Sequence, residues 1–134
     1  MTSLEINGTN YPLKFGLAFM REINKKYDKQ AEGAGFGRDD RGLVYAMLNV
    51  IGDKSIETLI TVIMAGAKSV KDNQLTESEL VEWLENEDTD IDGLFKEIES
   101  FFERSNFCRI PLKVTRDIVK NVDSMETEET KAEA

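Results

Sequence analysis

The amino-acid sequence predicts a mainly α-helical domain, in which an N-terminal β-hairpin is followed by a bundle of about five helices. Two strand-like runs near the N-terminus flank the turn-forming residues Asn7-Gly8-Thr9-Asn10. Apolar residues then recur every three or four positions through most of the chain, which is helical spacing. Residues 121–134 are acidic and poor in apolar side chains, so we expect a disordered C-terminal tail there. Residues 1–120 should form a single globular domain.

The N-terminal hairpin is expected over residues 3–15. Its strands would be the short runs Leu4–Ile6 and Tyr11–Phe15. Pro12 has no backbone N–H to donate, so its strand should lie at an edge of the sheet.

The helices follow the hairpin. We expect them at about residues 16–27, 43–51, 56–67, 76–84 and 91–102. A polar, glycine-rich connection, residues 28–40, separates the first two helices, and Gly52-Asp53 stops the second. Ser55 is the expected N-cap of the third helix, and Thr76 opens a capping box before the fourth. Val62 lies off the main apolar face of the third helix, which widens its buried surface and predicts a central position.

Between the fifth helix and the acidic tail, the pattern allows two interpretations. Leu112-Lys113-Val114 has the composition of a short strand. After it, Ile118, Val119 and Val122 have the spacing of a marginal helix. The sequence leaves both interpretations open.

Residues Asp88–Glu99 match the calcium-loop pattern of an EF-hand. Acidic side chains stand at loop positions 1, 3, 5 and 12, and Gly93 stands at the turn position 6. The same residues also suit the capped start of an amphipathic helix. The carboxylates would then lie near a helix N-terminus, where the helix dipole favours negative charge.

Continuous apolar spacing favours the helix over the calcium loop. Six apolar residues keep this spacing without a break: Ile91, Leu94, Phe95, Ile98, Phe101 and Phe102. A calcium loop would place the first two of them in non-helical backbone, whereas a helix capped by Thr89 or Asp90 explains all six. Lys96 would put a cation at loop position 9, and no second loop offers the same ligand spacing. We therefore expect no bound metal, with a calcium-responsive, EF-hand-like module as the alternative.

Composition argues against several classes of function. The formal net charge of −9 at pH 7 makes nucleic acid an unfavourable partner. The chain has no histidine, which removes the commonest general base. Cys108 is the only cysteine and lies among apolar residues, as a small core side chain does. No apolar run is long enough to span a bilayer, and no secretory signal is visible. We expect a non-catalytic cytoplasmic protein without a cofactor.

Several short motifs, in their order along the chain, resemble the tail assembly chaperones of long-tailed phages (siphophages) that infect Gram-positive bacteria. The motifs that carry the resemblance are Ile6-Asn7-Gly8, Tyr11–Gly16, Arg21-Glu22-Ile23, Gly35-Phe36-Gly37, Asp90–Phe95 and Ser105-Asn106-Phe107. They cover roughly Leu4 to Cys108. The resemblance also favours the helical interpretation of Asp88–Glu99.

The resemblance implies a phage or prophage protein that assists tail morphogenesis without catalysis. It implies binding to the tape measure protein and to tail tube subunits in the cytoplasm of the bacterial host, and absence from the mature virion. It also implies a longer, frameshifted form of the same chain as a partner, and self-association is a further expectation. Neither nucleic acid nor membrane is expected as a partner.

The densest apolar region beside the acidic tail is the expected protein-binding surface. It contains Phe101, Phe102, Phe107 and Ile110. A chaperone that holds an elongated client needs exposed apolar surface, kept soluble by like charge. Helically spaced apolar residues also commonly face a core, so burial of these side chains is the competing interpretation. A small acidic inhibitor or adaptor unrelated to phage tails is the remaining alternative function.

Overall fold

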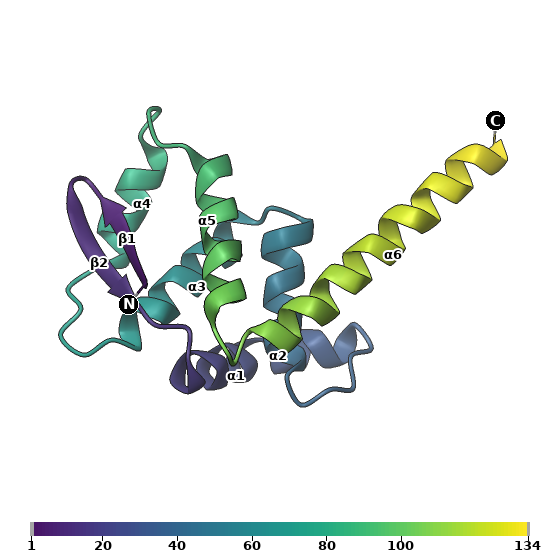
Figure 1. The fold of residues 1–134 in the computed structure, drawn as a ribbon, viewed down its shortest axis with the longest axis horizontal. Helices are drawn as coiled ribbons and strands as arrows, with labels where there is room; N and C mark the ends of the chain where they lie inside the picture. Colours follow the sequence, from purple (N-terminus) through teal and green to yellow (C-terminus); the bar gives the residue numbers. More distant parts are fainter. Residues whose placement is uncertain (1, 134) are drawn as a thin grey trace.

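The computed structural model describes the backbone of residues 2–133 and the side chains of residues 2–123. The elements are β1 (Thr2–Ile6), β2 (Thr9–Leu13), α1 (Leu17–Gly33), α2 (Arg41–Met47), the π-helix η1 (Leu48–Gly52), α3 (Ile56–Lys68), α4 (Glu77–Glu85), α5 (Ile91–Arg104) and α6 (Arg109–Glu133). Figure 1 shows the hairpin beside α4 at one end of the body, with α6 leaving the body at the other end. The predicted fold class, an N-terminal hairpin followed by a mainly helical body, is confirmed. One helix is added to those expected.

The hairpin has a two-residue turn. Ile6 pairs with Thr9, and Asn7 and Gly8 between them have φ angles of 52° and 82°. Both residues therefore adopt the left-handed conformation of a type I′ turn, which the Asn-Gly pair favours. Pro12 lies in a two-stranded sheet, where each strand is an edge, as predicted. The hairpin is joined to α3 through the backbone, because the Lys14 N–H donates to the Gly66 carbonyl at an N···O distance of 3.0 Å.

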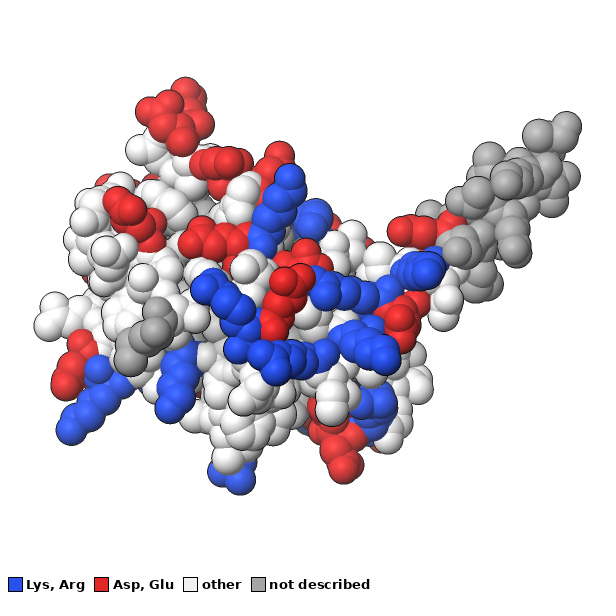
Figure 2. Space-filling model, in the orientation of Figure 1, with Lys and Arg blue, Asp and Glu red and all other residues white. Residues whose placement is uncertain are grey.

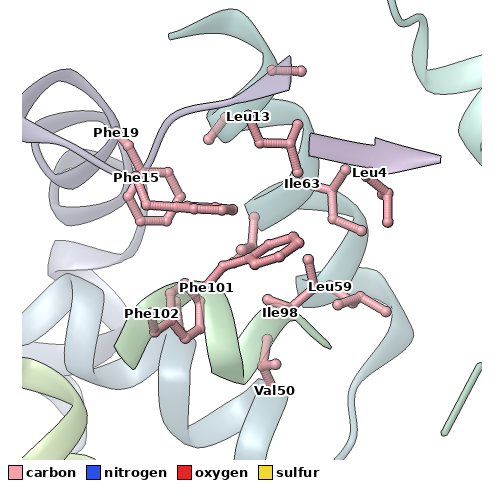
Figure 3. Close-up of a cluster of buried hydrophobic side chains, with 14 of the residues drawn as sticks. Leu4, Leu13, Phe15, Phe19, Val50, Leu59, Ile63, Ile98, Phe101 and Phe102 are labelled. Carbon is pink, nitrogen blue, oxygen red and sulfur yellow. The ribbon is translucent and has the colours of Figure 1, made fainter. Parts of the chain in front are cut away.

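Helix α3 lies at the centre of the hydrophobic core, as predicted. Leu59, Val62 and Ile63 are almost completely buried. Figure 3 shows side chains from the hairpin, α3 and α5 meeting in one cluster. At Gly66, a Cβ atom would lie 2.9 Å from the Phe15 ring, so only glycine lets this ring pack closely on the helix backbone. Phe15 thereby links the end of the hairpin to the centre of the fold.

Helix α1 is longer than the sequence indicates. It continues to Gly33 instead of ending near Tyr27, so the connection to α2 contains only residues 34–40. The extra turns carry many polar residues and therefore lack apolar spacing. They are held by the buried Ala31 and by an ion pair between Asp28 and Arg41 of α2, with an Nε–Oδ1 distance of 2.7 Å. Tertiary contacts, which local spacing does not reveal, extend the helix.

The second expected helix is divided into α2 and the π-helix η1, and it ends at Gly52 as predicted. Val50 is fully buried, whereas Leu48 and Ile51 are only half-buried. The wider π-turn shifts the side chains relative to the 3.6-residue spacing on which the prediction rested. The helix itself was correctly predicted, and only the side chains that face the core differ from the prediction.

The predicted helix caps are confirmed. Ser55 accepts a hydrogen bond from the Thr58 N–H at 3.2 Å, and Thr76 accepts one from the Glu79 N–H at 3.1 Å. Asp90 caps α5, with 2.9 Å between its Oδ1 and the Gly93 nitrogen. A Cβ atom at Gly93 would lie 2.4 Å from the other Asp90 carboxylate oxygen. The glycine of the calcium-loop pattern therefore makes room for a capping carboxylate, and the helical interpretation of this segment is correct.

The stretch with two open interpretations is helical. Leu112-Lys113-Val114 lies inside α6, so the strand interpretation is wrong. Leu112 and Thr115 are buried, and the Thr115 hydroxyl donates to the Pro111 carbonyl at 2.8 Å. The backbone of α6 continues to Glu133, but the side chains from residue 124 onward lie outside the described residues. The expected disorder of residues 121–134 therefore stays a prediction.

Candidate functional site

A groove with an apolar floor opens where the end of the hairpin meets the end of α5. Its volume is about 430 Å³. The residues that line it are Thr2, Leu13, Lys14, Phe15, Gly16, Phe101, Arg104, Ser105, Asn106 and Phe107. We call it the Phe107 groove, because Phe107 is its most exposed aromatic side chain, at 48%. A groove of this size suits the insertion of apolar side chains from a partner.

The groove joins two parts of the chain that lie about ninety residues apart. The Ser105 hydroxyl donates a hydrogen bond to the Phe15 carbonyl oxygen. The Cys108 thiol points to the same oxygen, with an S···O distance of 3.7 Å. These contacts fix the connection between α5 and α6 against the linker that leads from β2 to α1. The walls of the groove are therefore held by specific polar contacts.

Aromatic packing beneath the groove makes its floor firm. The Phe15 ring lies edge-on to Phe19, with 4.8 Å between ring centroids. Its centroid is 5.5 Å from that of Phe102 and 6.0 Å from that of Phe101. Such edge-to-face and tilted pairs add specific geometry to apolar burial. Figure 3 shows these four rings close together at the junction of the hairpin, α1 and α5.

The structure divides the four residues of the expected protein-binding surface into two groups. Phe101 and Phe102 are buried, with exposed fractions of 4% and 0%. For these two, the core interpretation is correct, although the edge of Phe101 reaches the groove floor. Phe107 and Ile110 are exposed, at 48% and 67%, around the start of α6. Only the second pair is accessible to a partner of the folded chain.

The charge of the groove is opposite to that of the molecule. Among the residues whose side chains are described, Lys14 and Arg104 are the only charged ones that line it, in a chain with a formal net charge of −9. The Arg104 guanidinium lies over the Phe101 ring, 5.0 Å from its centroid, which orients the cation along the groove wall. Figure 2 shows Lys and Arg side chains gathered where α5 meets α6, and Asp and Glu gathered over the opposite end of α4 and α5.

The basic surface continues from the groove along α6. Arg109, Lys113 and Arg116 line a second hollow together with Glu103 and Asp117. Arg116 pairs with Glu99 of α5, with an Nη2–Oε1 distance of 3.3 Å, and also with Glu103. These ion pairs tie the first half of α6 to α5. Sequence reasoning did not identify the basic rim, because its residues come from separate elements.

Cys108 is shielded from solvent in the folded chain. It is fully buried, and burial raises the pKa of its thiol to about 11. The thiol therefore stays protonated near neutral pH, although the thiolate is the nucleophilic form. The prediction that Cys108 is a small core side chain is confirmed.

The acidic residues of the calcium-loop pattern have separate structural roles. Asp90 caps α5, and Glu99 pairs with Arg116 of α6. Among the residues whose side chains are described, no three acidic or thiol groups lie close enough together to hold a metal ion. In the same part of the chain, no helix is long and apolar enough to cross a membrane.

Comparison with known families assigns the chain to a family. Residues 3–121 match the family model described as phage tail assembly chaperone protein, TAC. The chain belongs to this family. The match includes the hairpin, α1 to α5, the whole Phe107 groove except Thr2, and the first half of α6. No curated protein and no solved structure matches the chain. The match confirms the tail assembly chaperone family that the sequence motifs predicted. This tail assembly chaperone has the exposed Phe107 in a groove lined by Lys14 and Arg104.

Proposed function

We propose that this tail assembly chaperone binds the tape measure protein and tail tube subunits during tail morphogenesis. It acts in the cytoplasm of a Gram-positive host of a siphophage or prophage, has no catalytic role and is absent from the mature virion. A longer, frameshifted form of the chain and further copies of the chain itself are additional proposed partners. The family match supports the general role, and the surface of the described residues supports the mode of binding.

One observation supports the proposed mode of binding most strongly: Phe107 lines a groove with an apolar floor and is exposed, and Ile110, three residues further along the chain, is exposed as well. Most other large apolar side chains among residues 2–123 are buried or half-buried. An exposed aromatic residue beside a concave surface is typical of sites that accept the apolar face of a helix. A long helical client would bind there by inserting apolar side chains between Phe107 and the hairpin.

Co-expression with the tape measure protein tests this proposal. The wild-type chaperone should keep the tape measure protein soluble and should co-purify with it. The double variant Phe107→Ser/Ile110→Ser should reduce the soluble complex by about tenfold, because loss of two apolar anchors removes roughly 1–3 kcal/mol of binding free energy. Its melting temperature should remain close to that of the wild type, since both side chains are already exposed to water.

A matched control separates a specific site from general stickiness. Ile56 is 45% exposed on the first turn of α3 and does not line the groove. The variant Ile56→Ser should therefore retain the tape measure protein. Equal losses in both variants, or full retention by the double variant, would contradict the proposed surface.

A further inference from the structure

The acidic end of the chain has a chemistry that complements the Phe107 groove. Residues 121–133 contain five carboxylates and one lysine. Two apolar residues, Val122 and Met125, stand three positions apart. Glu126 follows Val122 by four positions, and Glu129 follows Met125 by four positions. On a helix, this spacing places the two apolar residues and the two glutamates along neighbouring rows. The segment therefore combines a short apolar face with negative charge.

The groove offers the matching features. Its floor contains Leu13, Phe15 and Phe101, and the charged residues of the described lining are the cations Lys14 and Arg104. The chain as a whole has a formal net charge of −9, so a groove whose described charged residues are both cations attracts an acidic segment. Apolar anchors flanked by opposite charges give both affinity and a preferred orientation. An acidic amphipathic segment fits the groove better than a neutral or a basic one does.

The length and direction of α6 place the acidic segment far from the groove of its own copy. The groove ends at Phe107, just before α6 begins at Arg109, and Figure 1 shows α6 running away from the body. At 1.5 Å per residue, the helix places residues 121–133 roughly 18–36 Å beyond its first residue. A continuous α6 therefore presents the segment to another molecule.

We propose that residues 121–133 of one copy occupy the Phe107 groove of a second copy when no client is bound. Val122 and Met125 lie against the apolar floor, and Glu126 and Glu129 face Lys14 and Arg104. The contact joins the segment of one copy to the groove of another, so two copies can exchange their segments or a third copy can bind a groove that is still free. If the groove is also the client site of the proposed function, the acidic segment covers it until the tape measure protein displaces it.

A peptide titration tests the contact without any client. The probe is a fluorescein-labelled synthetic peptide of residues 118–134. The receptor is the full chain with Glu126→Gln, Glu128→Gln and Glu129→Gln, so that its own segment no longer competes strongly. Anisotropy should show saturable binding. Adding Lys14→Glu and Arg104→Glu to the receptor should weaken binding about tenfold or more, since two attractive surface pairs become repulsive.

Controls in the same titration separate the groove from general charge attraction. Lys26 and Lys68 line a different hollow, and the receptor with Lys26→Glu and Lys68→Glu should bind the peptide as before. A peptide with Glu126→Lys and Glu129→Lys should bind better to the receptor with the reversed groove than to the one with the original groove. The single variant Lys14→Glu repeats the test without altering the Arg104–Phe101 contact. Absence of saturable binding, or equal loss in the control receptor, would overturn the proposal.

The wild-type full chain distinguishes docking between copies from docking within one copy. Docking between copies should make the mean mass in sedimentation rise with protein concentration, and the three Glu→Gln substitutions should suppress that rise. If the wild-type chain instead binds the labelled peptide equally weakly at all protein concentrations, its segment docks within one copy. That result would contradict the proposal. Retention of the tape measure protein by a chain whose groove does not bind the peptide would overturn this inference alone, and the proposed function would stand.

Discussion

At Gly42, α2 packs directly against the backbone of α1. A Cβ atom there would lie 2.5 Å from the Asn24 carbonyl oxygen, which belongs to the backbone of α1. The same turn of α1 also accepts a hydrogen bond, because the Leu43 N–H donates to the Asn24 side-chain oxygen at 2.7 Å. Gly42→Ala should therefore force the two helices apart and lower the free energy of unfolding by about 1–3 kcal/mol in chemical denaturation.

Gly33 provides the matched control for that substitution. It is the last residue of α1, and a Cβ atom there would meet nothing within 4 Å. Gly33→Ala should leave the stability unchanged or raise it slightly, since alanine favours helix. A Gly42→Ala variant as stable as Gly33→Ala would show that the helices do not cross as closely as described.

Cys108 should make the stability of the protein sensitive to alkaline pH. Burial raises the pKa of its thiol from 9.0 to about 11 in the folded state. Between these values the unfolded chain loses the thiol proton and the folded chain keeps it, so the unfolded state is favoured as the pH rises. The advantage of the wild type over Cys108→Ala should therefore shrink by roughly 2–3 kcal/mol between pH 9 and pH 11.

Denaturation curves of both proteins at several pH values measure this effect. Other groups titrate equally in the two proteins, so their difference reports the thiol alone. Below pH 9 the difference should be constant, because the thiol is protonated in both states. A difference that stays constant up to pH 11 would contradict a buried, protonated thiol.

At the scale of elements, the start of α5 tests the choice between a helix cap and a calcium loop. Asp90→Ala removes the carboxylate that accepts from the Gly93 N–H, and it should cost about 1 kcal/mol. Asp88 precedes the helix and would be the first calcium ligand of a loop. Asp88→Ala should therefore leave the melting temperature within about 2 °C of the wild type, since the change lies outside the cap.

Calcium itself completes this comparison. The melting temperatures of the wild type and of both variants should be the same in calcium and in chelator. A calcium-dependent rise of several degrees in the wild type, abolished by Asp88→Ala, would indicate a functional metal site at this segment.

The elements that could be predicted from the sequence share a strong local signal. The Asn7-Gly8 turn and the caps Ser55, Thr76 and Asp90 each stand next to an uninterrupted apolar pattern, and each is found where it was expected. The elements that differ depend on distant contacts. The last turns of α1 are polar along the sequence, and η1 is a π-turn that contacts α3, α5 and α6.

Helix α6 illustrates the same limit. Leu112-Lys113-Val114 has the β-branched and alternating composition of a strand, yet no neighbouring strand is available to pair with it in the two-stranded sheet. Its buried residues Leu112 and Thr115 instead lie on one side of a helix whose contacts include α2, α5 and η1. Tertiary packing outweighs local propensity here.

The candidate site could be predicted only in part, for a related reason. Apolar spacing pointed to the region from Phe101 to Ile110, but spacing alone does not distinguish a core residue from an exposed one. The structure buries Phe102 under Phe15 and leaves Phe107 in contact with water. Lys14 and Arg104 come together only because the hairpin packs against α5, so the basic rim of the groove required the fold.

For the whole molecule, the separation of charge suggests how partners are oriented. The end formed by α4 and the start of α5 is acidic, and the junction of α5 with α6 is basic (Figure 2). Long-range fields of this kind guide charged partners toward the surface of opposite sign before contact is made. An acidic client segment would therefore reach the Phe107 groove rather than the α4 end.

Hydrogen–deuterium exchange of the chaperone, alone and bound to the tape measure protein, tests the central claim most directly. Binding at the Phe107 groove predicts slower exchange of backbone amides in residues 13–16 and 104–113, with little change in α4. Slower exchange confined to α4 and the connection to α5, with residues 104–113 unchanged, would contradict the proposed client surface.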